Sequence, residues 1–173
     1  MGKRGFCRRK SGQMELSFGM IFSIILIIAF VAFSVYGIIK FLEFRDSAQI
    51  GTFEKNFATH VKAKWAGTEG AETHEYTLPG RIKEVCFISK TKPITDASRK
   101  EELKWINLDE GENLFFYPLN SAGNAGSAKI DYLNIDETTK DDNPFCILNK
   151  NGKVRLTLQK NYGENSVRVL RAQ

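Results

Sequence analysis

The longest apolar stretch of the chain is a run of 24 uncharged residues from Leu16 to Ile39, rich in Ile, Phe, Val and Ala. As an α-helix with a rise of about 1.5 Å per residue, this run extends about 36 Å. That length exceeds the hydrocarbon core of a bilayer, which is about 30 Å thick. Because a buried helix of a soluble protein is usually shorter and interrupted by polar positions, the pattern predicts a membrane-spanning helix.

The pattern becomes that of an amphipathic helix after Arg45 and Asp46. Apolar side chains then recur every three or four residues, at Ile50, Phe53, Phe57, Val61 and Trp65. Such spacing places them on one face of a helix of about five turns that ends near Gly67. One long helix, or two helices in tandem, would therefore connect the apolar run to the rest of the chain.

Beyond Gly70, apolar and polar residues alternate with a period of two, which predicts β-strands. The predicted strands are 76–78, 82–88, 114–117, 130–135, 145–148, 154–158 and 167–170. Asn151-Gly152 suits a turn with positive φ and predicts a hairpin between the fifth and sixth of these strands. A short helix is expected over 96–105, and the Gly- and Ser-rich segment 120–128 is expected to be a surface loop.

These elements predict an α+β fold. A long N-terminal transmembrane helix would continue into, or be followed by, an amphipathic helix packed on a small antiparallel β-sheet or sandwich. The expected organisation is a basic cytoplasmic leader (1–12), a transmembrane helix (13–44), and an extracytoplasmic helix with a β-rich domain (45–173).

Charge is concentrated at the N-terminus. The chain carries 25 Lys and Arg against 20 Asp and Glu, and five of these cations but no acid lie in residues 1–12. The chain from Gln13 onward is therefore formally neutral, and it lacks the basic patch expected of a nucleic-acid-binding domain. By the positive-inside rule, the cations before the apolar run place the N-terminus in the cytoplasm and the C-terminal domain outside.

A cleaved secretory signal peptide is the alternative interpretation of the same region. Its apolar part is typically about 7 to 15 residues long and ends at a small-residue cleavage site. The run in this chain is longer and is followed by Lys40-Phe41-Leu42-Glu43-Phe44. We therefore expect the helix to be retained as a single-pass anchor in the cell membrane, with the lipid bilayer as its surroundings.

The residues before the apolar run carry a resemblance to a known family. Basic residues are followed by Lys10-Ser11-Gly12-Gln13 and then by the uninterrupted apolar helix. This arrangement resembles the class III signal peptide of archaeal type IV pilin-like proteins. The resemblance implies that a prepilin peptidase cuts between Gly12 and Gln13 and leaves the helix on the mature chain. Where the family usually has Ser and Glu at the third and fifth mature positions, this chain has Glu15 and Ser17.

Glu15 is a candidate assembly contact. A carboxylate at the head of an apolar segment is unfavourable unless it stays at the membrane interface or finds a partner. Cleavage after Gly12 would create an α-amine at Gln13, with which Glu15 of a neighbouring subunit could pair. Alternatively, Glu15 stays among the headgroups or near the positive end of its own helix. Self-association through this helix is also suggested by its small residues, which allow close approach.

The chain has three cysteines, of which Cys7 lies in the leader and Cys86 and Cys146 lie in predicted strands. In an oxidising exterior, a disulfide between Cys86 and Cys146 would close a loop of about 60 residues and stabilise the fold by about 4 kcal/mol. Neighbouring antiparallel strands can bring two Cα atoms within disulfide reach. Two free buried thiols are the alternative, and the sequence leaves both open.

No motif in the sequence predicts catalysis. His60, in the predicted helix, and His74, before the first strand, lack metal-ligand spacing with the cysteines. The sequence contains no nucleophile elbow, Walker signature or calcium loop, and Gly123, Gly126 and Lys129 do not have the spacing of a phosphate-binding loop. We therefore expect no metal, no cofactor and no enzyme activity.

Two functional hypotheses follow. The first is a surface-displayed, pilin-like subunit with a structural or adhesive role, anchored by its N-terminal helix and processed by a prepilin peptidase. The second is an uncleaved bitopic membrane protein whose outer β-rich domain is a ligand- or partner-binding module. They differ at Gly12 and Gln13, because only the first requires cleavage there.

Overall fold

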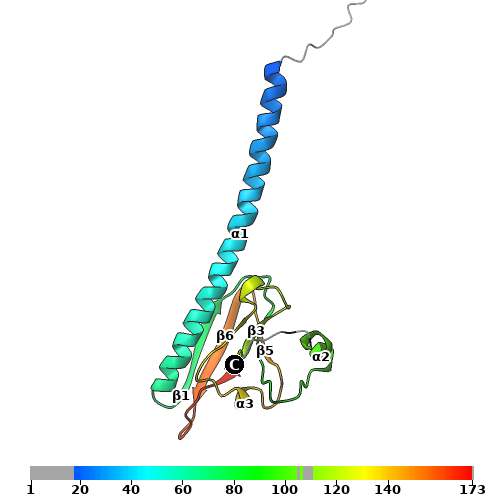
Figure 1. Cartoon of the computed structure of the whole chain (residues 1–173). Helices are drawn as coiled ribbons and strands as arrows, with labels where there is room; N and C mark the ends of the chain where they lie inside the picture. Colours follow the sequence, from blue (N-terminus) through cyan, green and yellow to red (C-terminus); the bar gives the residue numbers. More distant parts are fainter. Residues whose placement is uncertain (1–17, 105, 107–110, 173) are drawn as a thin grey trace, which may run out of the picture. The chain divides into compact units, whose positions relative to one another are not determined.

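The computed structural model describes residues 18–104, 106 and 111–172, and within them the chain has an α+β fold (Figure 1). A long N-terminal helix is followed by short helices and strands in two small antiparallel sheets. In chain order the elements are α1 (Phe18–Ala66), β1 (Gly70–Thr77), β2 (Glu84–Phe87), α2 (Ala97–Leu103), β3 (Leu114–Tyr117), η1 (Gly123–Ala125), β4 (Ser127–Ala128), α3 (Ile135–Thr138), β5 (Phe145–Leu148), β6 (Lys153–Lys160) and β7 (Arg168–Arg171).

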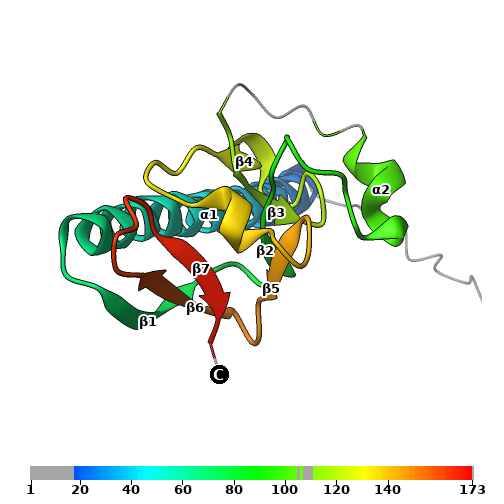
Figure 2. The same ribbon diagram turned by 90° about the horizontal axis from the view of Figure 1, so that it is seen from below.

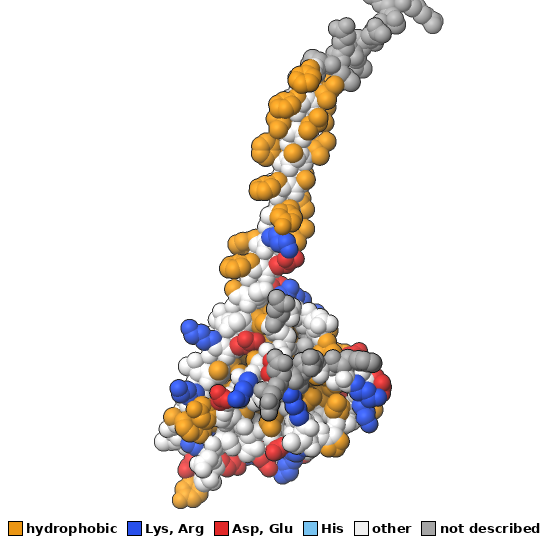
Figure 3. Space-filling model, in the orientation of Figure 1, with side chains coloured by type: hydrophobic (Ala, Val, Ile, Leu, Met, Phe, Trp, Pro, Cys, Tyr) orange, Lys and Arg blue, Asp and Glu red, His pale blue; other side chains and the backbone are white. Residues whose placement is uncertain are grey.

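α1 is one continuous helix, so the chain does not form two helices in tandem. It passes through both of the compact units into which the chain divides, residues 1–42 and residues 43–173. In the first unit its large apolar side chains are exposed around the helix, from Phe18 onward (Figure 3). The hydroxyls of Ser23 and Ser34 donate to carbonyls of their own helix, 2.8 and 2.7 Å away. Backbone and side-chain polar groups satisfied within one apolar helix are what a bilayer requires.

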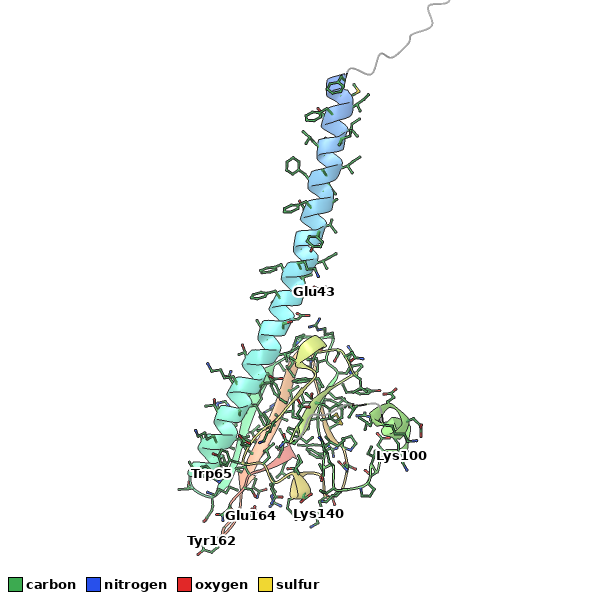
Figure 4. All side chains as sticks on the ribbon, viewed as in Figure 1. Glu43, Trp65, Lys100, Lys140, Tyr162 and Glu164 are labelled. Carbon is green, nitrogen blue, oxygen red and sulfur yellow. A yellow bond between two sulfur atoms is a disulfide. The ribbon has the colours of Figure 1, made fainter. Side chains whose placement is uncertain are left out.

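In the second unit, α1 presents an apolar face to the domain core. Ile50, Phe53, Phe57 and Val61 are buried, in agreement with the predicted amphipathic face. The ring of Phe53 meets that of Tyr76 on β1 edge to face, with centroids 5.2 Å apart. Trp65, at the end of the helix, is only half-buried and donates its indole N–H to the carbonyl of Asn165 at 3.0 Å (Figure 4).

The strands form a three-stranded sheet in the order β1-β6-β7 and a four-stranded sheet in the order β4-β3-β2-β5, all antiparallel (Figure 2). β6 alternates as its sequence predicts: Val154, Leu156 and Leu158 are buried, whereas the residues between them are more exposed. The larger core joins these residues to the apolar face of α1. A smaller core of Cys86, Ile88, Leu103 and Phe115 connects α2 to the outer side of the four-stranded sheet.

The predicted hairpin between 145–148 and 154–158 is wrong, although its turn chemistry is right. Asn151 and Gly152 have the expected positive φ values of 55° and 79°. However, β5 pairs with β2, and β6 pairs with β1 and β7. The side chain of Asn149 donates to the carbonyls of Pro79 and Ile82 at 3.1 and 2.8 Å, which holds the chain at the end of β2. The turn therefore connects two sheets instead of two paired strands.

The expected strand 130–135 is also wrong. Leu133 makes an isolated bridge to Val167, and α3 begins at Ile135. Asn134 caps this helix, because its side-chain oxygen accepts the N–H of Glu137 at 3.1 Å. Asn favours such local hydrogen bonds over a strand ladder.

Of three further predictions about the elements, two differ from the structure and one agrees with it. The first strand begins at Gly70, six residues earlier than predicted, since it pairs along all of β6. The segment 120–128 is not entirely a loop, because Ser127–Ala128 pairs with β3. The helix expected over 96–105 is confirmed as α2, which Asp96 caps by accepting the N–H of Ser98 at 3.0 Å.

Candidate functional site

Of the residues singled out in the sequence, Gly12, Gln13 and Glu15 lie outside the described part of the chain. Cys86 and Cys146 lie directly opposite each other on β2 and β5, with their Cα atoms 4.1 Å apart. Their sulfur atoms form a disulfide. The candidate site described below surrounds this disulfide.

The two sulfur atoms have different surroundings. Cys86 is fully buried in the smaller core, whereas Cys146 is partly exposed and lines a cavity of about 900 Å³. The place of each strand in the sheet explains the difference, because β2 has a neighbouring strand on both sides and β5 is an edge strand. The cavity therefore gives access to the disulfide from the side of Cys146.

Arg99 of α2 lies against the disulfide. Its Nη1 atom is 3.0 Å from Sγ of Cys146 and 3.8 Å from Sγ of Cys86. The guanidinium also forms ion pairs with Glu84 of β2 and with Asp96, the latter at 3.1 Å, and lies over the ring of Tyr117 at 4.7 Å. The hydrogen bond to Glu84 raises the pKa of Arg99 above its ordinary value, so the group beside the sulfur atoms is a permanent cation.

The cavity lies between the two sheets and carries charges of both signs. From the three-stranded sheet, Lys153 pairs with Glu75 at 2.6 Å. Arg171, on β7 of the same sheet, pairs with Asp142 at 3.1 Å and lies 4.7 Å over the ring of Phe145. The rest of the lining comes mainly from β5 and the segments that flank it: Pro144, Cys146, Ile147, Leu148 and Lys150.

β5 is an outer strand of the four-stranded sheet and lies beside this cavity, where the carbonyl of Cys146 accepts from Nη2 of Arg171 at 3.4 Å. The N–H of Asn149, which follows β5, donates to the carbonyl of Lys83, which precedes β2, at 2.7 Å. The N–H of Ile88, which follows β2, points the other way and donates to the carbonyl of Asn113, which precedes β3, at 3.0 Å. Hydrogen-bonding direction alternates along an antiparallel strand, so Phe145 and Ile147 bond to β2. The backbone groups of Cys146 and Leu148 therefore point away from β2, toward the cavity that both residues line. Such an edge can pair with an extended peptide.

Glu84, Cys86 and Cys146 could be taken for a metal site, because their potential ligand atoms all lie within 4.8 Å of one another. Cysteine binds metals as a thiolate. Because both sulfur atoms are joined in a disulfide, this set does not have the ligands of a metal site in the form described.

The two histidines come together although 14 positions separate them in the chain. Their rings stack with centroids 4.1 Å apart, between α1 and β1. Nδ1 of His60 is 2.8 Å from the hydroxyl oxygen of Tyr76, and the buried Lys64 pairs with Glu72 at 2.8 Å. Burial and the neighbouring His60 lower the pKa of His74.

Sequence reasoning did not identify Arg99 as part of the site. Arg99 is one of five consecutive polar or charged residues, 98–102, in a short helix, a pattern that indicates a solvated helix. Its contact with Cys146 bridges 47 positions and depends on the pairing of β2 with β5. No local pattern encodes that contact.

Comparison of the chain with protein-family models, with curated proteins and with solved structures gives no match.

Proposed function

We propose that this chain is a single-pass membrane protein of the pilin-like kind, displayed on the cell surface with a structural or adhesive role. The observation that carries the proposal is the composition of α1. One uninterrupted helix exposes apolar side chains over its first half and supplies Ile50, Phe53, Phe57 and Val61 to a domain core in its second half. A single element thus combines the membrane anchor and part of the domain.

Three features of the sequence support the same proposal. The basic residues before Gly12, the Gly12-Gln13 pair and the apolar helix resemble a class III signal peptide. Five N-terminal cations favour a cytoplasmic N-terminus and an outer C-terminal domain. Removal of these cations would also remove their attraction to anionic lipid, which favours transfer of the helix from the bilayer into an assembly.

The experiment is co-expression of the full chain with an archaeal prepilin peptidase, followed by mass analysis of the N-terminal peptide. Cleavage is expected to produce a chain that starts at Gln13, and only when the peptidase is present. The Gly12→Val variant is the matched control and should stay uncut. Recovery of the cut chain in sheared surface material would support assembly, and a chain that keeps its basic residues under all conditions would contradict the proposal.

A second candidate is an uncleaved membrane protein whose outer domain binds a partner. The mixed-charge cavity and the outward backbone groups of Cys146 and Leu148 favour an extended peptide as the ligand. Leu148→Pro removes one N–H from the cavity side but spares the ladder to β2, whereas Leu148→Ala keeps that N–H. Peptides selected on the wild-type chain should lose affinity for Leu148→Pro and keep it for Leu148→Ala. Equal binding to both variants would contradict pairing at this edge.

A further inference from the structure

We propose that the Cys86–Cys146 disulfide is a thiol–disulfide exchange site, in which a dithiol reductant attacks Cys146 and Cys86 is the leaving residue. This inference goes beyond the proposed function, because it depends on the outer domain alone and not on leader cleavage or assembly. It rests on the access to the two sulfur atoms and on the position of Arg99.

Access favours reaction at one sulfur atom. An incoming thiolate must approach a sulfur atom in line with the S–S bond, so a covered sulfur is protected. Sγ of Cys86 lies in a core with Ile88, Leu103 and Phe115. Cys146 instead lines the cavity of about 900 Å³, which has room for a dithiol. The mixed disulfide is therefore expected on Cys146.

Charge favours opening of the bond. A neighbouring cation stabilises a thiolate relative to the thiol and makes the sulfur a better leaving group. The Arg99 guanidinium is close to both sulfur atoms, at 3.0 Å from Cys146 and 3.8 Å from Cys86. Whichever sulfur atom leaves, its new negative charge therefore forms next to this cation.

Glu84 limits this effect and also has a use in the reaction. Its carboxylate pairs with Arg99 and so offsets part of the cationic charge. The Glu84 side chain is largely buried, and its Oε2 atom lies 3.9 Å from Sγ of Cys86. In the reduced protein, this carboxylate can accept the S–H of Cys86. Glu84 would then keep Cys86 in the thiol form, and the Arg99 guanidinium would stabilise the thiolate of Cys146.

The exchange balances with a dithiol as the co-reactant. A thiolate of the reductant attacks Sγ of Cys146, a bond forms between these two sulfur atoms, and the Cys86–Cys146 bond breaks. The electron pair of that bond goes to Sγ of Cys86, which then takes up a proton. The second thiolate of the reductant then attacks the reductant sulfur that is bonded to Cys146. The mixed disulfide breaks, and Cys146 leaves as a thiolate beside Arg99. The protein gains two electrons, and the reductant becomes a disulfide.

The first test measures how fast dithiothreitol reduces the disulfide in the full chain, in detergent micelles at pH 7. The Cys7→Ser background ensures that only Cys86 and Cys146 are counted when new thiols are trapped with a maleimide. Arg99→Gln is expected to react about 3- to 10-fold more slowly, because loss of a close cation raises a thiol pKa by about 1 to 2 units and exchange rates follow that pKa with a slope of about 0.5.

Arg155→Gln is the matched control, because Arg155 lines the same cavity and is removed with the same loss of charge. It should react at the wild-type rate. Arg99→Lys keeps the charge and should recover part of the loss, which separates the electrostatic role from a change in folding. Equal rates for Arg99→Gln, Arg155→Gln and the wild type would overturn the proposal, as would a disulfide that is reduced only after urea unfolds the chain.

The second test identifies the reacting sulfur by a different signal. In the Cys7→Ser background, Cys86→Ser leaves Cys146 free and Cys146→Ser leaves Cys86 free. Glutathione disulfide should attach to Cys146 at least 10-fold faster than to Cys86, as measured by mass spectrometry. The pH midpoint for alkylation of Cys146 should lie below that of a free cysteine, and Arg99→Gln should raise it. Faster attachment to Cys86, or a midpoint that Arg99→Gln does not move, would contradict the assigned roles.

Discussion

His60 of α1 and His74 of β1 stack their imidazole rings 4.1 Å apart, where the helix packs on the first strand. The pKa of His74 is lowered, first by burial and then by the positive charge that His60 can carry. Lys64 also disfavours a proton on His74, whereas Glu72 favours one. The folded domain therefore resists protonation of His74 at a pH where the unfolded chain accepts it.

From this relationship we predict a loss of stability in mild acid. Above pH 6.5, the ordinary pKa of His74, this residue is neutral in both the folded and the unfolded chain. Its contribution to the free energy of unfolding is then fully present. As the pH falls from 6.5 through the lowered pKa of the folded state, the unfolded chain binds the proton first and the free energy of unfolding decreases. Urea unfolding of wild type and His74→Gln between pH 7.5 and 5 checks this. The wild-type decrease should be steeper, and parallel curves would contradict the prediction.

Glu54 should produce the opposite pH dependence. Burial, together with the charge of Glu112, raises the pKa of Glu54 from 4.5 to about 7. As the pH rises from 4.5 to about 7, the unfolded chain loses this proton before the folded chain does, so stability falls. Glu54→Gln should therefore raise the melting temperature at pH 7.5 more than at pH 5. Glu101→Gln, at a side chain that is 76% exposed, is the control and should change neither value.

Phe57 is predicted to be a main source of domain stability. It is fully buried, and its ring lies within 6 Å of the rings of Phe53, Tyr76 and Phe87, centroid to centroid. Phe57→Ala should lower the free energy of unfolding by about 3 to 5 kcal/mol, because it removes apolar contacts and leaves a cavity. Tyr162→Ala should have little effect, since Tyr162 is 88% exposed. A loss of similar size in both variants, measured by urea unfolding in micelles, would contradict this assignment.

Asn143 is predicted to fix the loop that precedes β5. Its buried amide donates to the carbonyls of Ser89 and Lys92, both at 3.0 Å, and accepts the N–H of Ser89 at 3.0 Å. Asn143→Leu would leave these backbone groups without partners, and each buried unsatisfied group costs about 1 to 3 kcal/mol. We expect Asn143→Leu to destabilise the domain by at least about 2 kcal/mol in urea unfolding. Asn56→Leu, at an exposed position of α1, is the surface control and should lose less.

The elements predicted correctly are those that depend on local spacing. Ile50, Phe53, Phe57 and Val61 form a helical face by spacing alone, and alternation in β6 assigns Val154 to the core. Asn151-Gly152 predicted its own positive φ values. In each case the information lies within a few residues of the feature.

The errors and omissions depend on contacts between distant parts of the chain. Asn151-Gly152 does not determine which strands pair, because the position of β5 depends on Asn149 meeting Pro79 and Ile82. The environment of Cys146 depends in the same way on Arg99, which a separate helix supplies. Sequence periodicity identifies a face of an element, but it does not identify the partner of that face.

The composition of α1 also determines where the protein can be cut. A protease acting between Phe44 and Ile50 would release a fragment that keeps every buried side chain of the helix and none of its large exposed apolar side chains. Truncation at Gly67 instead would take Phe53, Phe57 and the rest of that face out of the core, and would leave β1 without its cover. A water-soluble form of the domain must therefore start upstream of Ile50, although the β-strands begin only at Gly70.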